Sequence, residues 1–219
     1  MAERWEKRCR EIAMAGRPDC WRDSEVPGEG CDAPARAVFL LGFMGSGKST
    51  VGHALSRQLE WRFEDLDERI QAREGRSIAE IFRDSGEVGF RQAEHRALRE
   101  LVEERPPSSP VVVALGGGAF VQAENAALLK AAGALTVFLD APVDELWRRC
   151  QNEDEPDERP LRRDERQFRQ LYEARRSRYM NALLRLDTAG KDVESIAAEI
   201  IASLRLQFKL PQKDLGEEK

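Results

Sequence analysis

The chain has 219 residues, a formal net charge of −5 and a pI near 5.4, with 41% hydrophobic and 34% charged residues. This composition predicts one soluble domain with appended ends, long enough to bury a core. The negative net charge gives no basic surface for binding nucleic acid. No run of residues approaches the ~18 apolar residues of a membrane span. Because the N-terminus lacks a signal-peptide core and the four cysteines form no C-x-x-C pair, we expect a cytoplasmic protein with reduced thiols.

Residues 1–35 are predicted to be a flexible N-terminal extension that carries no motif residue. Cys9, Cys20 and Cys31 are evenly spaced, but the spacing matches no zinc pattern and no histidine lies nearby. We therefore interpret the segment as a mobile tail or an interaction segment, and we expect the protein to be a monomer.

The first predicted element is a buried strand at residues 37–41. It leads into Gly42-Phe43-Met44-Gly45-Ser46-Gly47-Lys48-Ser49, which fits the phosphate-loop pattern G-x-x-x-x-G-K-[ST]. A helix is predicted to follow, because apolar residues recur at helical spacing. In this context the loop amides and the helix dipole bind the phosphates of a nucleoside triphosphate, with Lys48 reaching the β- and γ-phosphates and Ser49 holding Mg²⁺. An accidental glycine turn is the alternative.

A short strand is predicted to end near Asp65 and to feed a helix that begins around Asp67. Ligands of open α/β sheets bind outside the carboxyl ends of strands, so these carboxylates are candidates for a metal and for a substrate hydroxyl. A helix N-cap with an ordinary first-turn acid is the alternative interpretation. Further on, residues 77–80 form a capping box, and Gly86 is predicted to end the helix that the box opens.

Arg91 and Glu94 lie three residues apart near the start of a longer helix and are predicted to pair, either in a site or as a solvated surface feature. A strand at residues 111–115 leads directly into the glycine triplet, which consists of Gly116, Gly117 and Gly118. Three glycines at the end of a strand cost entropy unless the backbone must approach something closely, so we expect a bound molecule beside them. A flexible turn is the alternative.

The remaining chain continues the alternation of strands and helices. Residues 151–166 are almost entirely charged and are predicted to form a mobile lid, with a solvated loop as the alternative. Residues 208–219 are predicted to be a flexible tail. We expect helices at residues 124–132, 143–150, 168–180 and 196–206, and strands at residues 134–139 and 184–186. The alternation predicts a three-layer α/β fold, with about five parallel strands covered by helices on both faces.

Taken together, these motifs resemble those of the shikimate kinases from about residue 38 to residue 206. They appear in the order of that family, and they are the phosphate loop, Asp65-x-Asp67, the segment at residues 75–82, Gly86-Glu87-x-x-Phe90-Arg91-x-x-Glu94, the glycine triplet and Arg159-Pro160-Leu161. The resemblance implies a P-loop kinase domain over residues 36–207. It also implies transfer of the γ-phosphoryl group of ATP to the 3-hydroxyl of shikimate with Mg²⁺, a step of aromatic amino-acid biosynthesis.

The resemblance also implies a role for each motif residue. Catalytic roles fall to Lys48, Asp67 and Arg159. Metal contacts fall to Ser49 and Asp65; ATP contacts to Gly45, Ser46, Gly47, Lys48, Ser49, Thr50, Arg149, Arg159 and Lys191; and substrate contacts to Asp67, Arg91, Glu94, Gly116, Gly117, Gly118 and Arg175. Arg176 stays open as the alternative to Arg175 in binding the substrate carboxylate.

Three features depart from the family pattern. The N-terminal extension has no counterpart, the lid before Arg159 is longer and more acidic, and Ser177 stands where the family usually has proline. Two other functions remain alternatives. One is a nucleotide-dependent sensor or interaction module, and the other is a P-loop kinase for a different small hydroxylated substrate such as gluconate.

Overall fold

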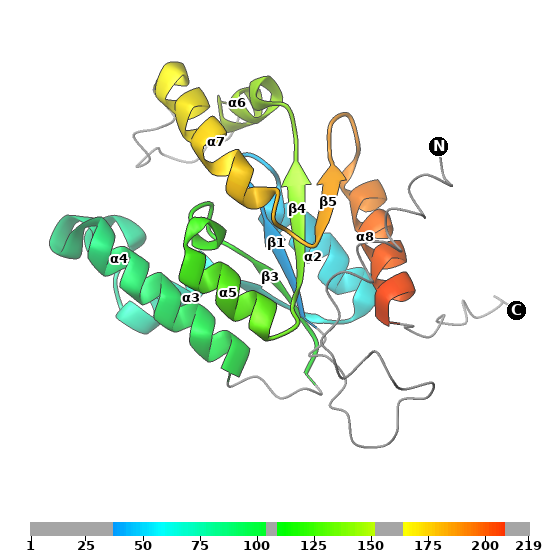
Figure 1. Ribbon diagram of the computed structural model, residues 1–219, viewed down its shortest axis with the longest axis horizontal. Coiled ribbons are helices and arrows are strands. Elements are labelled where there is room, and N and C mark those ends of the chain that lie inside the picture. The colour runs from blue at the N-terminus through cyan, green and yellow to red at the C-terminus, as the bar shows by residue number, and fades with distance from the viewer. Residues whose placement is uncertain (1–36, 104–108, 152–163, 209–219) are drawn as a thin grey trace, which may run out of the picture.

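The computed structural model describes residues 37–103, 109–151 and 164–208 (Figure 1). Five strands form one sheet in the order β2-β3-β1-β4-β5, and every neighbouring pair is parallel. The strands are β1 (Ala37–Leu41), β2 (Arg62–Asp65), β3 (Val111–Ala114), β4 (Leu135–Asp140) and β5 (Leu184–Asp187). The predicted α/β fold with a central parallel sheet is confirmed.

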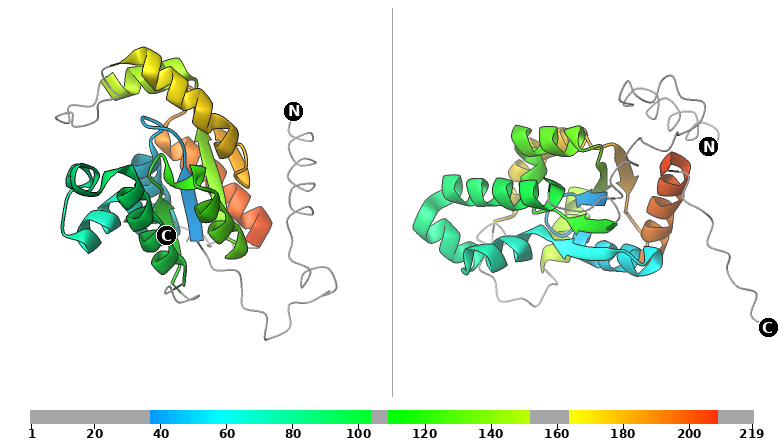
Figure 2. Two further views of the ribbon diagram at one scale, coloured as in Figure 1. Left: turned by 60° about the vertical axis from the view of Figure 1, so that its left-hand side comes forward. Right: turned by 90° about the horizontal axis from the view of Figure 1, so that it is seen from below.

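Helices follow each strand and cover both faces of the sheet (Figures 1 and 2). They are α2 (Lys48–Leu59), α3 (Leu66–Glu74), α4 (Ile78–Glu103), the short 3₁₀ helix η2 (Ala119–Val121), α5 (Ala123–Ala131), α6 (Val143–Gln151), α7 (Glu165–Tyr179) and α8 (Val193–Phe208). None of the helices in the described part of the chain is long and apolar enough to cross a membrane.

The core has two halves because successive side chains of a strand point to opposite faces of the sheet. Phe39 and Leu41 of β1 join one apolar cluster with α3, α4, α5, α6 and α7. Val38 and Leu40 join the other cluster with α2 and α8. All four side chains are almost fully buried. The central strand is thus apolar on both sides, as a parallel sheet between two helical layers requires.

The predicted helix signals act as expected. In the capping box, Ser77 Oγ accepts from the Glu80 amide at 3.2 Å, and the Glu80 carboxylate accepts from the Ser77 amide at 2.8 Å. Gly86 has φ 65° and ψ −173°, a conformation that breaks α4 into two segments. Helical structure then resumes at once, so the break is a kink between two halves and not a long loop.

The boundaries predicted for the lid need correction at both ends. Gln151 closes α6, and Glu165 and Arg166 already lie in α7. The earlier start of α7 has a clear cause, because Asp164 caps the helix by accepting from the Gln167 amide at 3.0 Å. Most of the predicted lid, including Arg159, and both predicted terminal appendages lie outside the described residues, except that α8 reaches residue 208.

Candidate active site

The predicted site segments meet at one edge of the sheet. The phosphate loop follows β1, Asp65 ends β2, and the glycine triplet follows β3 after one residue. Because the three strands are parallel neighbours, their carboxyl ends lie side by side. This is the edge at which open α/β sheets bind ligands.

The phosphate loop has the backbone that its glycines allow. Gly45 and Gly47 adopt left-handed conformations, with φ of 76° and 80°. Gly47 precedes the first residue of α2, so the loop amides lie at the positive end of that helix. Lys48 Nζ donates to the Phe43 carbonyl at 3.0 Å, which folds the lysine back over the loop. The loop therefore fits the polyphosphate of a nucleotide.

Helix α6 packs directly against this loop. A Cβ added to Gly45 would lie 2.8 Å from both Cys150 Sγ and the Leu146 carbonyl, so no larger residue fits there. Arg149 donates to the Gly45 carbonyl at 3.4 Å, which places this predicted ATP contact beside the loop. Lys191 is different: it lies after β5 and pairs with Glu199 of α8 at 2.6 Å.

The predicted metal residues are in contact. Ser49 Oγ donates to Asp65 Oδ2 at 2.9 Å, while Asp65 Oδ1 accepts from the Asp67 amide at 2.9 Å and caps α3. The helix-cap interpretation of Asp65 is therefore correct, and it coexists with a hydroxyl–carboxylate pair next to the loop. Such hard oxygen ligands suit Mg²⁺, which usually takes one or two protein oxygens and completes its shell with water and phosphate. Thr50 is exposed in the first turn of α2.

Two carboxylates converge on the glycine triplet. A Cβ on Gly116 would lie 2.6 Å from Asp67 Oδ1 and 3.3 Å from Glu94 Oε1. Only glycine leaves room for both groups, which explains the first glycine of the triplet. Glu94 is 1% exposed, and burial raises its pKa, although the nearby Arg91 guanidinium opposes that rise.

Arg91 lies between Glu94 and the third glycine. Its Nη1 donates to Glu94 Oε2 at 2.9 Å, and its Nη2 donates to Glu87 at 3.4 Å. A Cβ on Gly118 would approach the Arg91 guanidinium to 2.5 Å. The predicted pairing of Arg91 with Glu94 is thus present. Both side chains are largely buried, so the pair is not a solvated surface feature.

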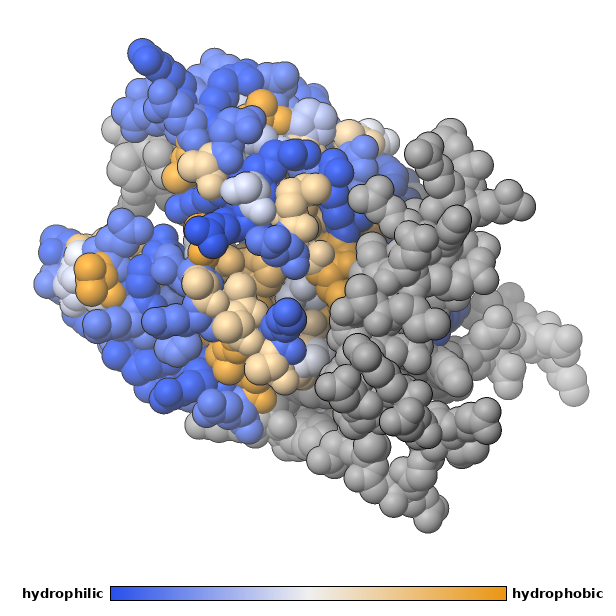
Figure 3. Space-filling model, in the orientation of Figure 1, coloured by the Kyte–Doolittle hydropathy of each residue, from blue (hydrophilic) through white to orange (hydrophobic). Residues whose placement is uncertain are grey.

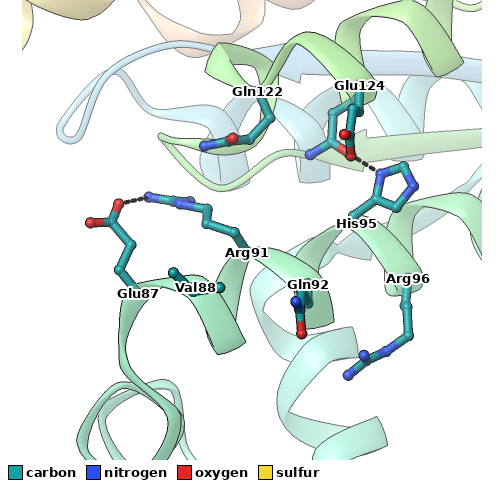
Figure 4. Close-up of a pocket in the computed structure, with 9 residues that line it drawn as sticks. Glu87, Val88, Arg91, Gln92, His95, Arg96, Gln122 and Glu124 are labelled. Atoms are coloured by element: carbon teal, nitrogen blue, oxygen red, sulfur yellow. Dashed lines mark hydrogen bonds and ion pairs between the residues drawn. The ribbon is translucent and has the colours of Figure 1, made fainter.

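On its outer flank Arg91 borders a cavity of about 560 Å³ between α4 and the segment that joins η2 to α5 (Figure 4). The view shows Arg91 directed toward Glu87, with His95 one turn further along α4. His95 Nδ1 lies 2.7 Å from Asn125 Oδ1, and the Asn125 amide donates to the Ala119 carbonyl at 3.0 Å. This fully buried asparagine links α4 to the backbone that follows the glycine triplet.

Arg175 reaches the middle glycine from α7. Its Nη1 donates to the Gly117 carbonyl at 3.3 Å, and its guanidinium lies 5.9 Å from the centre of the Phe43 ring in the phosphate loop. Arg176 points elsewhere, because it donates to Asp140 at the end of β4 at 3.1 Å. The geometry therefore favours Arg175 over Arg176 at the glycine triplet.

Sequence reasoning missed two groups around α7. Tyr179, the last residue of the helix, donates its hydroxyl to the Gly117 carbonyl. Asp140 is 5% exposed and accepts from Arg176 and from Arg185 of β5, whose Nε lies at 2.8 Å, as well as from the Tyr172 hydroxyl at 3.2 Å. This cluster fixes α7 to the sheet. The sequence did contain one signal for Tyr179: it stands four residues after Arg175, a spacing that places both side chains on one face of a helix.

A phosphate loop, a hydroxyl–carboxylate pair beside it, and a neighbouring region lined by two arginines and two carboxylates define a P-loop kinase of small molecules. Comparison with known proteins gives the family. The family model described as shikimate kinase matches residues 44–205. The shikimate kinase of Persephonella marina is 39% identical over 78% of this chain and 99% of its own length. The shikimate kinase of Geobacter sulfurreducens is 43% identical over 82% and 94%.

Solved structures agree with these relatives. The shikimate kinase of Acinetobacter baumannii in complex with shikimate has a TM-score of 0.70 and 34% identity, and covers 82% of this chain and 97% of that one. A gluconokinase of Sinorhizobium meliloti has a TM-score of 0.53 at 20% identity, over 80% of this chain and 95% of that one, and shares the fold alone. The chain belongs to the shikimate kinase family.

Proposed function

We propose that this chain transfers the γ-phosphoryl group of ATP to the 3-hydroxyl of shikimate, with Mg²⁺ bound. The observation that carries the proposal is the convergence of Arg91 and Arg175, from two helices far apart in sequence, on the glycine triplet. Both are half-buried, and a pair of guanidiniums in such a place suits a carboxylate. A nucleotide sensor has no need of such a clamp.

Phosphoryl transfer requires positioning and charge stabilisation more than covalent chemistry. The amides of the phosphate loop and Lys48 would hold the phosphates and stabilise negative charge on the transferred group. Ser49 and Asp65 would hold Mg²⁺, which neutralises phosphate charge when bound. Gly45, Ser46, Gly47 and Thr50 would complete the nucleotide contacts, with Arg149 beside the loop.

On the substrate side, Asp67 would orient a hydroxyl. Its carboxylate lies against Gly116, near the buried Glu94, and its backbone amide donates to Asp65. It would accept hydrogen bonds from the attacking hydroxyl and take its proton. Glu94 would hold Arg91 in place, and Gly117 would bring its backbone to the substrate.

Two assigned contacts have less structural support. Lys191 is engaged by Glu199, so an adenine-side role would need that ion pair to open. Arg159 lies outside the described residues. We further propose that the enzyme acts as a cytoplasmic monomer, and light scattering after size exclusion would test the oligomeric state.

A coupled assay of ADP release tests the proposal. Purified protein should consume ATP only with shikimate and Mg²⁺ together. Quinate and gluconate are useful controls because they also carry a carboxylate, so they test hydroxyl placement and not only the arginine clamp. Lys48→Met should abolish turnover and keep the circular dichroism spectrum. Equal turnover with gluconate, or none with shikimate, would remove the assignment.

A further inference from the structure

Tyr179 is a buried side chain whose polar end reaches the substrate region. It is 1% exposed, and its ring packs against Phe138 of β4 with ring centres 5.2 Å apart. Its hydroxyl donates to the Gly117 carbonyl, so the last residue of α7 is tied to the middle of the glycine triplet. A tyrosine is needed here only for that hydroxyl, because phenylalanine would fill the same apolar space.

The Gly117 carbonyl has a second donor in Arg175. The Nη1–O distance of 3.3 Å is long for an N–H···O hydrogen bond, so this contact is the weaker of the two. The Arg175 guanidinium is the group proposed to bind the substrate carboxylate. The Gly117 carbonyl oxygen therefore accepts hydrogen bonds from two side chains, a buried tyrosine and an arginine that is also proposed to bind the substrate.

The tyrosine is a permanent donor. Burial raises the pKa of Tyr179 to about 12, although the charge of Arg175 and a hydrogen bond from its guanidinium to the hydroxyl lower it. The hydroxyl thus keeps its proton throughout the pH range in which the enzyme is expected to work. Its ring is buried against Phe138, which favours a fixed position when Arg175 turns toward a ligand.

We propose that Tyr179 is a positioning residue for carboxylate binding: it keeps the Gly117 carbonyl hydrogen-bonded while Arg175 turns to the substrate. The inference rests on the proposed function, since it concerns the same site. Without the hydroxyl, Arg175 is the one remaining side-chain donor to the Gly117 carbonyl among the residues that the structure describes. The substrate carboxylate must then compete with the carbonyl for the guanidinium, because a poorly solvated carbonyl is costly to leave unpaired.

The test compares two variants that each remove one oxygen atom from the same helix. Tyr179→Phe removes the hydroxyl at Gly117. Tyr172→Phe, two helical turns earlier, removes a buried hydroxyl that donates to Asp140 and the Ala141 carbonyl, each at 3.2 Å, and accepts from Arg176 Nε at 3.1 Å. Asp140 and Arg176 keep each other as partners in that variant, so Tyr172→Phe reports the cost of losing a buried hydroxyl of α7 away from the glycine triplet.

For Tyr179→Phe we expect the KM for shikimate to rise about tenfold, equivalent to roughly 1.4 kcal/mol, while the KM for ATP stays within twofold. Its preference for shikimate over the amide analogue of shikimate should fall by a similar factor, because the charged carboxylate binds Arg175 more strongly than the neutral amide does. Tyr172→Phe should keep both the KM for shikimate and the acid preference within twofold. A general loosening of α7 would not separate acid from amide.

A second measurement leaves the fold untouched. The chain has two tyrosines, so 3-fluorotyrosine labelling of the wild type gives two fluorine signals, which Tyr172→Phe assigns. Shikimate should shift the Tyr179 signal more than the amide analogue does, because the carboxylate draws Arg175 from the shared carbonyl more strongly than the amide. Equal shifts with acid and amide would overturn the inference.

The outcomes separate this inference from the function on which it rests. Wild type that does not phosphorylate shikimate overturns the proposed function and this inference with it. Wild type that is active, with Tyr179→Phe behaving like Tyr172→Phe toward shikimate and its amide, overturns only the role of Tyr179. A selective loss of acid binding in Tyr179→Phe supports both.

Discussion

Replacing Arg91 by alanine tests whether the buried ion pair has two separable tasks, one in folding and one in binding. The variant leaves Glu94 buried at 1% exposure without its cation at 2.9 Å. Removing one partner of a buried pair costs about 3–5 kcal/mol. That loss is a large part of a total stability of ~5–15 kcal/mol. For a chain of this size it should lower Tm by roughly 6–20 °C.

The loss should depend on pH in a defined direction. Burial already raises the pKa of Glu94 above its ordinary 4.5, and without Arg91 the pKa rises further. Well below pH 4.5 the carboxyl is protonated in both the folded and the unfolded chain, so little stability is lost there. As the pH rises the unfolded chain ionises first. Stability therefore falls by up to about 1.36 kcal/mol per pH unit until the pH passes the folded pKa.

The double variant Arg91→Ala/Glu94→Gln separates the two tasks. A neutral amide of the same size needs no cation, so the double variant should regain most of the lost stability at pH 8. Its KM for shikimate should nevertheless stay about tenfold to a hundredfold above wild type, because one charge-assisted contact of roughly 1.5–3 kcal/mol is missing. Urea unfolding at pH 5 and pH 8, beside steady-state kinetics, measures both. A pH-independent loss, or a double variant no more stable than Arg91→Ala, would refute the reasoning.

The other predictions concern the loop and the triplet. Ser49→Ala should raise the Mg²⁺ concentration for half-maximal rate severalfold, and an unchanged Mg²⁺ titration would count against its metal role. Gly118→Ala should raise the KM for shikimate at least tenfold, because the new methyl would meet the Arg91 guanidinium at 2.5 Å. Gly117→Ala is the matched control, since its methyl would meet Arg175 only at 3.6 Å, and its effect should be clearly smaller. Similar KM values for the two alanine variants would contradict the packing argument.

The sequence predicts much of the fold because its strands are short apolar runs, and because capping residues and glycines mark where helices begin and end. The strand at residues 37–41 is found with the predicted bounds, and the capping box at Ser77 and the break at Gly86 act as predicted. Boundaries were missed where a polar side chain extends a helix. Asp164 caps α7 and Asp192 caps the start of α8, each four residues before the first apolar residue of the predicted periodic pattern.

The site is only partly visible in the sequence. Its local motifs could be found because glycine, lysine and acidic residues stand at fixed spacing. Contacts made across the fold carry no such signal. Arg175 and Arg176 are chemically alike, and only the rotation of α7 directs one to Gly117 and the other to Asp140.

Helix arrangement also explains how the chain brings two arginines to the glycine triplet. In the space-filling view, hydrophilic side chains cover the outer surfaces of α4 and of α6 and α7, while more apolar ones gather over α5 between them (Figure 3). Arg91 and Arg175 come from the two hydrophilic sides and reach inward to the glycine triplet. The spacing of 84 positions between them gives no hint of this meeting.

The central claim is that the chain phosphorylates shikimate at its 3-hydroxyl. The most direct measurement is a ³¹P–¹H correlation spectrum of the product formed from ATP, Mg²⁺ and shikimate by the purified protein. The account predicts a single phosphate ester coupled to the proton at position 3, absent when Lys48→Met replaces the wild type. A phosphate at another position, or ADP and free phosphate without any ester, would contradict it.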